Sequence, residues 1–525
     1  MKKLAVICLV ILAVGGTLFV IKRNSADNLY LEEGLNAPFV KIARNTYSVS
    51  DLTAFNIMLY HHPIRGMRDR FPGSRSTSTL FVETQVLYPQ ASAYRRQVMS
   101  GAEWKWKDIY IPGQIYQVNV IDQNMGVSDE DILSYFKRNK DELSAEFRLE
   151  EGDTLTLGRA RATIVRRLFL INFPPTAEFA AQFSSAPQTE IENAWFQQAS
   201  GDRAAFFRDL LYRQRFGRDF PRENTRAELV GQGKLISEQD LNIVLSWIPS
   251  AQNVPENMVA ARMAAWILFA DKARASGFLK TRRYRQIREQ FERFEVVRHF
   301  VNEVLPNRIS DEWRPNEEFV RFAIADQSRN PSLNVSRDQL AIFSDSLKNI
   351  MHEARIVEFI HGRRTRANVM FLNRDYADLF ERTPAQLRRE ADSLIANNNP
   401  DRARRIFRNL SEWFLYSPEG LSAFLEMAKL QADARNYMEA INAYRNYLLF
   451  GGNESEWCRV FFMIGYIYAE YLGDSPFAAM NYRWILKNAP DCSLASDAEF
   501  MYLNLGEPMI SIEELRQMSI RQGRE

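Results

Sequence analysis

Apolar residues recur every three to four positions along most of the chain, which predicts a largely helical protein. The interval 281–305 is the clearest example, and its expected buried face consists of Ile287, Phe291, Phe294, Val297, Val301 and Leu305. The interval 258–275 is strongly apolar, and Gly277 is placed to cap its C-terminal end. Ser128 can cap a helix whose apolar face begins at Ile132. No run of alternating residues is long enough for a large sheet.

The first third of the chain is expected to hold shorter helices. Residues 24–47 are polar and mixed, which is typical of a linker, and Ser50 is placed to cap a short amphipathic helix. Pro, Gly, Arg and Ser in 63–79 indicate a loop, and a second amphipathic helix is expected over 80–99.

The middle of the chain reads as mostly helix. An apolar run over 160–173 fits a helix or an extended segment, and 195–216 fits one helix. Residues 306–335 are predicted to be a loop, with helices resuming near 337–359. The interval 366–372 favours one short strand.

The first 23 residues carry the clearest topological signal. An uncharged run from Leu4 to Ile21 lies between basic residues at both ends. About twenty apolar residues span a bilayer as a helix, and a somewhat shorter run suffices. A cleaved signal peptide is the alternative, but it needs a small-x-small cleavage site that is not evident here. We therefore expect an uncleaved anchor with the large C-terminal part outside the cytoplasm.

The last quarter of the chain repeats itself at a fixed period. The small residues Ala391, Ala428 and Gly465 follow one another at intervals of 37 residues. Two antiparallel helices pack closely only where small side chains meet, and one hairpin cannot bury its own face, so neighbouring hairpins must stack. The predicted repeat-packing residues are Ala391, Ala403, Phe407, Ala428, Ala440, Tyr444, Gly465, Ala478, Tyr482 and Pro490.

This pattern resembles the tetratricopeptide repeat family, whose consensus pairs a small residue in each helix with an aromatic residue and a closing proline. The period here is slightly long, and Leu472-Gly473 adds one residue between two helices. The resemblance implies three repeats from Pro384, a capping helix over 495–505 and a protein-binding α-solenoid. An arbitrary helical bundle is the alternative.

Two further segments resemble the SurA-like envelope chaperone and parvulin prolyl-isomerase family. They are 127–141 and 270–278, the second followed by the helix 283–305 and Pro306. The resemblance implies chaperone-like helices. A Gly-rich stretch and a late Gly-x-His-Ile-like strand, both typical of a parvulin domain, are missing after Asp141 and after Pro306. No catalytic residue is therefore carried over.

Composition narrows the partner class. A net charge of +2 from 67 basic and 65 acidic residues argues against a dedicated nucleic-acid binder. No HExxH, CxxC, Walker A or GxGxxG motif is present, and the adjacent pair His61-His62 projects in two directions from a helix. We therefore predict no catalytic, cofactor-binding or metal-binding residues.

Two features leave alternatives open. Cys458 and Cys492 could form a bridge in an oxidising compartment or remain two buried thiols. The basic stretch 280–298 has interleaved Glu residues at salt-bridge spacing, which favours a solvated helix face over contact with acidic lipid or an acidic partner.

Together these features predict a mostly α protein in four parts. The parts are a transmembrane helix at 1–23, a linker with N-terminal helices at 24–125, a SurA/PpiD-like helical domain at 126–380 and a TPR-like array with its cap at 381–510.

The predicted location is the bacterial inner membrane, with a single span and the soluble part in the periplasm. The predicted partners are proteins, either unfolded clients or envelope assembly components, with no nucleic acid. The expected function is that of a chaperone or scaffold in secretion or outer-membrane assembly. A divergent parvulin-type peptidyl-prolyl isomerase is the alternative.

Overall fold

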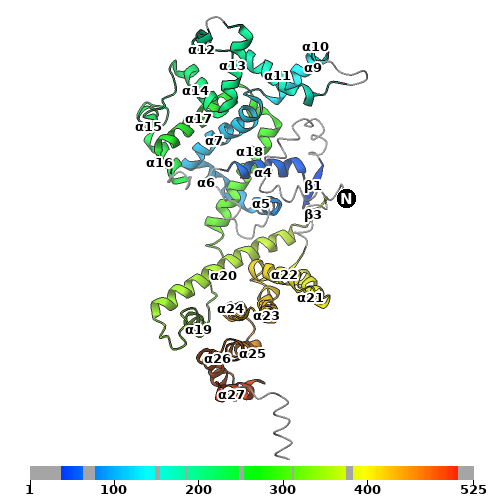
Figure 1. Cartoon of the computed structure of the whole chain (residues 1–525), viewed down its shortest axis with the longest axis vertical. Coiled ribbons are helices and arrows are strands. Elements are labelled where there is room, and N and C mark those ends of the chain that lie inside the picture. The colour runs from blue at the N-terminus through cyan, green and yellow to red at the C-terminus, as the bar shows by residue number, and fades with distance from the viewer. Residues whose placement is uncertain are drawn as a thin grey trace, which may run out of the picture. The chain divides into compact units, whose positions relative to one another are not determined.

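The computed structural model describes residues 37–62, 77–147, 154–183, 186–247, 254–309, 312–373 and 382–506. Across these residues the protein is mostly helical, as the apolar periodicity predicts (Figure 1). Contacts divide the chain into two compact units, one of Met1–Phe300 with Ala367–Asn373 and one of Val301–Arg366 with Arg374–Glu525. The sequence-based boundaries at 125/126 and 380/381 each fall inside one of these units.

The first unit combines three strands with a set of helices. The strands are β1 Pro38–Ile42, β2 Asn45–Ser48 and β3 Val369–Phe371. The helices up to residue 146 are α4 Val49–Tyr60, α5 Thr77–Ala91, η2 Ser92–Tyr94, α6 Arg95–Ser100, α7 Ala102–Tyr116, η3 Gln117–Ile121, α8 Asp122–Asn124, α9 Asp129–Arg138 and α10 Lys140–Glu146. The later helices are α11 Leu157–Asn172, α12 Ala177–Ala180, η4 Ala181–Phe183, α13 Gln188–Gly201, α14 Arg203–Phe216, α15 Thr225–Leu229, α16 Glu238–Trp247, α17 Glu256–Ala275, η6 Phe278–Lys280 and α18 Arg282–His299.

The sheet has the order β2-β1-β3, and both pairings are antiparallel. The expected strand within 366–372 is confirmed as β3, which pairs Val369 with Ile42. The predicted linker over 24–47 is wrong for its last part, because β1 and β2 form a hairpin there. Five- and four-residue strands are too short to give a clear alternation in the sequence.

The long charged helix is confirmed as α18, which continues into the π-helical turn η7 Phe300–Val304. All six side chains of its predicted apolar face are buried. The prediction that Ser50 caps the first short amphipathic helix is wrong. α4 begins two residues earlier with a capping box between Ser48 and Asp51, because β2 ends at Ser48.

Two helix predictions in this unit need correction in detail. The interval 195–216 contains the end of α13 and all of α14. α13 ends at Gly201, and the Asp202 side chain caps the N-terminus of α14. The interval 80–99 is also broken, into α5, η2 and α6, and α5 is buried around most of its surface rather than amphipathic. Elsewhere α7 and α17 approach closely, since a Cβ on Gly113 would lie 2.4 Å from the carbonyl oxygen of Trp266.

The described residues of the second unit form helices joined by turns and loops, with no strand among them. Its elements after η7 are α19 Glu317–Gln327, α20 Arg337–Arg366, α21 Pro384–Ala396, α22 Pro400–Trp413, α23 Pro418–Asp433, α24 Tyr437–Leu449, η9 Glu454–Glu456, α25 Trp457–Tyr466, η10 Ile467–Tyr471, α26 Ser475–Asn488 and α27 Ala495–Leu503. The prediction of a loop over 306–335 is wrong, because α19 lies inside it. Buried residues of α19 and α20 share one hydrophobic core with α23 to α27.

The predicted anchor at 1–23 and residues 63–76 of the predicted loop at 63–79 lie outside the described residues. The prediction is wrong for residues 77–79, because α5 begins at Thr77. Among the helices that are described, none combines the length and the apolar character needed to cross a bilayer.

Candidate functional site

The C-terminal helices form three consecutive antiparallel hairpins. We call α21 with α22 repeat 1, α23 with α24 repeat 2, and α25 with α26 repeat 3. Of the ten predicted repeat-packing residues, nine are buried in or between the hairpins: Ala391, Ala403, Phe407, Ala428, Ala440, Tyr444, Gly465, Ala478 and Tyr482. A Cβ added to Gly465 would lie 2.8 Å from the ring of Tyr482. The tenth residue, Pro490, is exposed in the turn after α26.

Helix α19 packs into a notch formed by repeats 2 and 3. The ring of Phe319 lies 4.7 Å from that of Trp457, 5.5 Å from Phe461 and 5.7 Å from Trp484. Phe461 and Trp484 stack with their ring centroids 3.9 Å apart, and Phe322 meets the edge of Phe461. Aromatic contacts of this kind bury large apolar areas, so this end of α19 is held by the hydrophobic effect.

The other end of α19 is held by charge. Asp326 forms an ion pair with Arg445 of α24 and accepts a hydrogen bond from the Tyr468 hydroxyl. Arg445 also donates to that hydroxyl over 3.2 Å, and all three side chains are buried. A buried ion pair is tolerated only when its partners satisfy one another. We call the five contact residues of the repeats the α19 seat: Arg445, Trp457, Phe461, Tyr468 and Trp484.

Local sequence explains why α19 is a helix. The Asn316 side chain accepts hydrogen bonds from the backbone N–H groups of Glu318 and Phe319, which caps the N-terminus. Glu317 and Glu318 place negative charge in the first turn, where the helix dipole favours it. The helix ends just before Arg329, whose φ of 50° is left-handed.

A second groove lies on repeats 1 and 2 and remains open. Its volume is about 340 Å³, and it is bounded by α20, α22, α23 and α24. Phe424 and Met427 form apolar lining, whereas Arg408 and Glu412 are exposed on the rim. We call this feature the open groove, and its principal lining residues are Ile350, Arg408, Glu412, Phe424, Met427 and Asn446.

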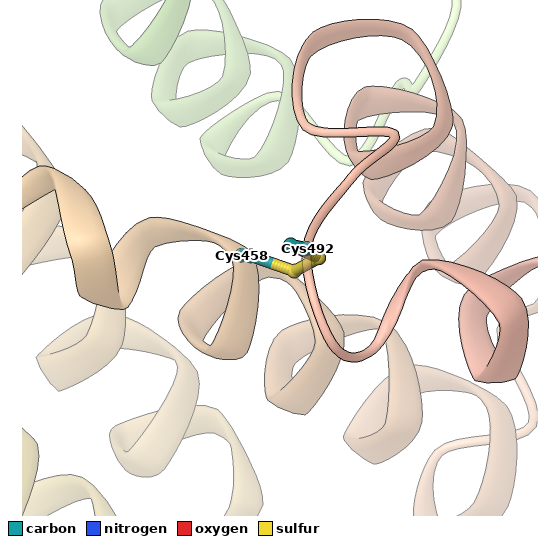
Figure 2. Close-up of a disulfide and its surroundings, with 2 residues drawn as sticks. All are labelled: Cys458 and Cys492. Carbon is teal, nitrogen blue, oxygen red and sulfur yellow. A yellow bond between two sulfur atoms is a disulfide. The ribbon is translucent and has the colours of Figure 1, made fainter.

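Cys458 and Cys492 form a disulfide (Figure 2). Of the two alternatives left by the sequence, the structure has the bridge. It joins the start of α25 to the turn between α26 and α27, across a sequence separation of 34 residues. Cys458 directly follows Trp457, so the bridge fixes the end of repeat 3 that holds Phe319. Sequence spacing alone could not decide the pairing, because the closeness of the two sulfurs depends on how α25 and α26 stack.

The first unit contains a buried ion cluster centred on Glu295 of α18. Glu295 lies 2.8 Å from His62 Nε2 and 2.5 Å from Lys107 Nζ, and it accepts two further hydrogen bonds from Arg298. Burial alone would raise the pKa of Glu295, but Lys107, Arg298 and the hydrogen bond from His62 hold that pKa well below its usual range. The basic stretch of α18 therefore does more than form a solvated face, since its Glu295 closes a charge network inside the unit.

A cavity of 370 Å³ adjoins this cluster and is lined by residues of α6, α7, α16 and α18. Both signs of charge line it, with Lys107 and Arg298 beside Glu103. Of the predicted histidine pair, His62 joins the cluster, whereas burial lowers the pKa of His61 to about 4. Across the described ranges there is no group of three or more His, Cys, Asp or Glu residues placed to hold a metal ion. The charges are neutralised within the protein, so we assign the cluster a structural role.

Comparison with known proteins identifies no relative: the chain matches no family model, no curated protein and no solved structure.

Several of these features were not found from the sequence. The α19 seat was missed because Asp326 and Tyr468 are 142 residues apart, and no local pattern links such distant positions. The start of α19 did leave a signal, the cap at Asn316 followed by two Glu residues. The sequence also gives a signal for Arg408, since an arginine recurs 37 residues later at Arg445.

Proposed function

We propose that this protein is a membrane-anchored envelope protein that binds other proteins through its C-terminal helical hairpins, as a chaperone or scaffold in secretion or outer-membrane assembly. In this proposal the three hairpins with α27 are a tetratricopeptide-like array, the region 126–380 supplies SurA-like chaperone helices, and 1–23 is the anchor. The observation that carries the proposal is the open groove, where apolar lining and an exposed cation meet on stacked hairpins. Apolar anchors surrounded by polar rims are typical of protein-binding sites.

The disulfide supports the proposed compartment. Bridges persist in oxidising environments such as the bacterial periplasm and are rare in the cytosol. The Cys458–Cys492 bridge therefore fits a soluble part that lies outside the cytoplasm. The uncharged run from Leu4 to Ile21 fits an anchor that would place it there.

Site-specific photo-crosslinking in native membranes tests the binding claim. A photoreactive amino acid at Ile350, in the wall of the open groove, is expected to form discrete adducts with other proteins. Ile342 gives a matched control, because it is also an isoleucine on the same helix and is more exposed than Ile350, but it does not line the groove. Adducts that are absent at both positions, or equal at both, would contradict binding at this groove.

A second assay separates the two forms of the proposal. A chaperone is expected to keep an unfolded client soluble when the full chain is added, whereas a scaffold leaves client aggregation unchanged. Extraction of membranes with alkaline carbonate, together with protease access from the periplasmic side, tests the anchor and its orientation.

A further inference from the structure

Three of the five positions of the α19 seat have counterparts one repeat earlier that line the open groove. Moving back 37 residues from Arg445 leads to Arg408, and the same step from Phe461 leads to Phe424. Leu472-Gly473 adds one residue before α26, so Trp484 corresponds to Asn446 at a step of 38. Arg408, Phe424 and Asn446 all line the open groove. The groove is therefore the same notch, one repeat earlier.

The two notches differ in their occupant. In the α19 seat, Arg445 is buried and paired with Asp326. In the open groove, Arg408 is exposed and forms no ion pair with any residue in the part of the chain that the structure describes. Repeats 1 and 2 thus retain the cation and one aromatic side chain, Phe424, whereas no carboxylate among the described residues pairs with Arg408.

We propose that the open groove binds a helical segment of a partner protein that carries the same two groups as α19, an aromatic side chain and, seven residues later, a carboxylate. Phe319 and Asp326 have this spacing, which places both on one face of a helix, two turns apart. The aromatic group lies on Phe424 and Met427, and the carboxylate pairs with Arg408. This inference rests on the proposed function and names the class of partner.

The lining also sets limits on the ligand. Asn446 stands where the seat has Trp484, Gly420 where it has Trp457 and Gln431 where it has Tyr468, so this notch offers less aromatic surface than the seat. Its volume of 340 Å³ lies at the lower end of the range of about 300–1,000 Å³ for ligand pockets, enough for a few side chains rather than a whole helix. Glu412 on the rim opposes additional acidic groups. The groove therefore selects one carboxylate beside one apolar anchor.

The probe is a peptide of residues 316–328 of this chain, labelled with a fluorophore and stapled between positions 317 and 321. The staple is needed because so short a helix is marginal in water, and Glu317 and Arg321 are exposed in α19. Fluorescence anisotropy with the full chain in detergent is expected to show saturable binding. A peptide with Asp326→Asn should bind about threefold more weakly, as expected for loss of one partly exposed charge pair.

Three variants of the chain assign the site. Arg408→Glu should weaken peptide binding about tenfold, because it reverses the charge that pairs with the ligand. Glu412→Gln should strengthen binding, because it removes the opposing charge. Arg405→Glu makes the same change as Arg408→Glu at an exposed position of α22 outside the groove, so it should leave the affinity near that of the unaltered chain.

No saturable binding, or binding of equal strength by the Arg408→Glu and Arg405→Glu variants, would overturn the inference. Self-association of the full chain that depends on Arg408 would identify a second copy as the occupant and would overturn the assignment to a partner protein. If Ile350 forms crosslinks in membranes but the peptide does not bind, the proposed function stands. Only the inference about the class of ligand is then rejected.

Discussion

The α19 seat and the open groove lie one repeat apart and differ mainly in how far their charges are buried. In the seat, Asp326 and Arg445 are buried, form an ion pair, and are both hydrogen-bonded to the Tyr468 hydroxyl. In the groove, Arg408 remains on the rim, and Asn446 takes the position of Trp484. Equivalent positions of successive repeats can therefore be buried or exposed. Which of the two occurs depends on whether a neighbouring helix supplies the complementary charge.

The largest expected effect comes from removing the carboxylate in the seat. Asp326→Ala should lower the free energy of unfolding by about 3–5 kcal/mol, because it leaves Arg445 buried without its anion. Denaturant titration of the full chain and hydrogen exchange of α19, α24 and α25 measure this loss. The double variant Asp326→Leu with Arg445→Met is the control and should recover most of the stability. A loss below about 1 kcal/mol would mean that the pair is not buried as described.

The next effect concerns the bridge that fixes repeat 3. Replacing Cys458 and Cys492 with Ser should destabilise the second unit by about 3–4 kcal/mol, as chain entropy predicts for a loop closed over 34 residues. Thermal unfolding of the unaltered chain with and without a reductant should reproduce the shift, and the double Ser variant should not respond to the reductant. If full reduction leaves the thermal unfolding of the unaltered chain unchanged, the disulfide has no stabilising role.

A smaller effect is expected at the close contact within repeat 3. Gly465→Ala should cost about 1–3 kcal/mol, because the new methyl group would meet the ring of Tyr482. The equivalent position in repeat 2 already carries an alanine, Ala428, so the reverse change there should cost only about 0.5–1 kcal/mol through backbone entropy. Urea midpoints of the two variants measure both values. Equal tolerance at the two sites would show that repeats 2 and 3 pack alike.

The smallest effect is expected in the open groove. Arg408→Ala should change the unfolding free energy by no more than about 0.5 kcal/mol, because the side chain is exposed. Denaturant titration beside Asp326→Ala makes the comparison direct. If Arg408→Ala lowered the free energy of unfolding by several kcal/mol, Arg408 would be a core residue. The two notches would then not differ in the burial of their arginines.

Sequence reasoning succeeded where local periodicity decides the structure. The apolar face of α18 is continuous over 18 residues, and the small residues Ala428 and Gly465 mark helices that must pack closely. It failed at α19, an 11-residue helix enclosed by proline-containing turns. Its partners Arg445 and Trp484 lie more than a hundred residues away, and their proximity arises only from the stacking of hairpins. The charge cluster at Glu295 was missed for the same reason, since Lys107 and His62 come from distant elements.

The position of β3 in the chain has a consequence for biosynthesis. β1 is the central strand of the sheet, and one of its two neighbours is contributed by residues 369–371. A nascent chain that has reached only residue 300 contains nearly all of the first unit but leaves one edge of β1 without its partner. α19 and α20 must be translated before the sheet can close. Completion of the first unit is therefore delayed until part of the second has emerged from the ribosome, and truncation at residue 300 would expose an unpaired strand edge that favours aggregation.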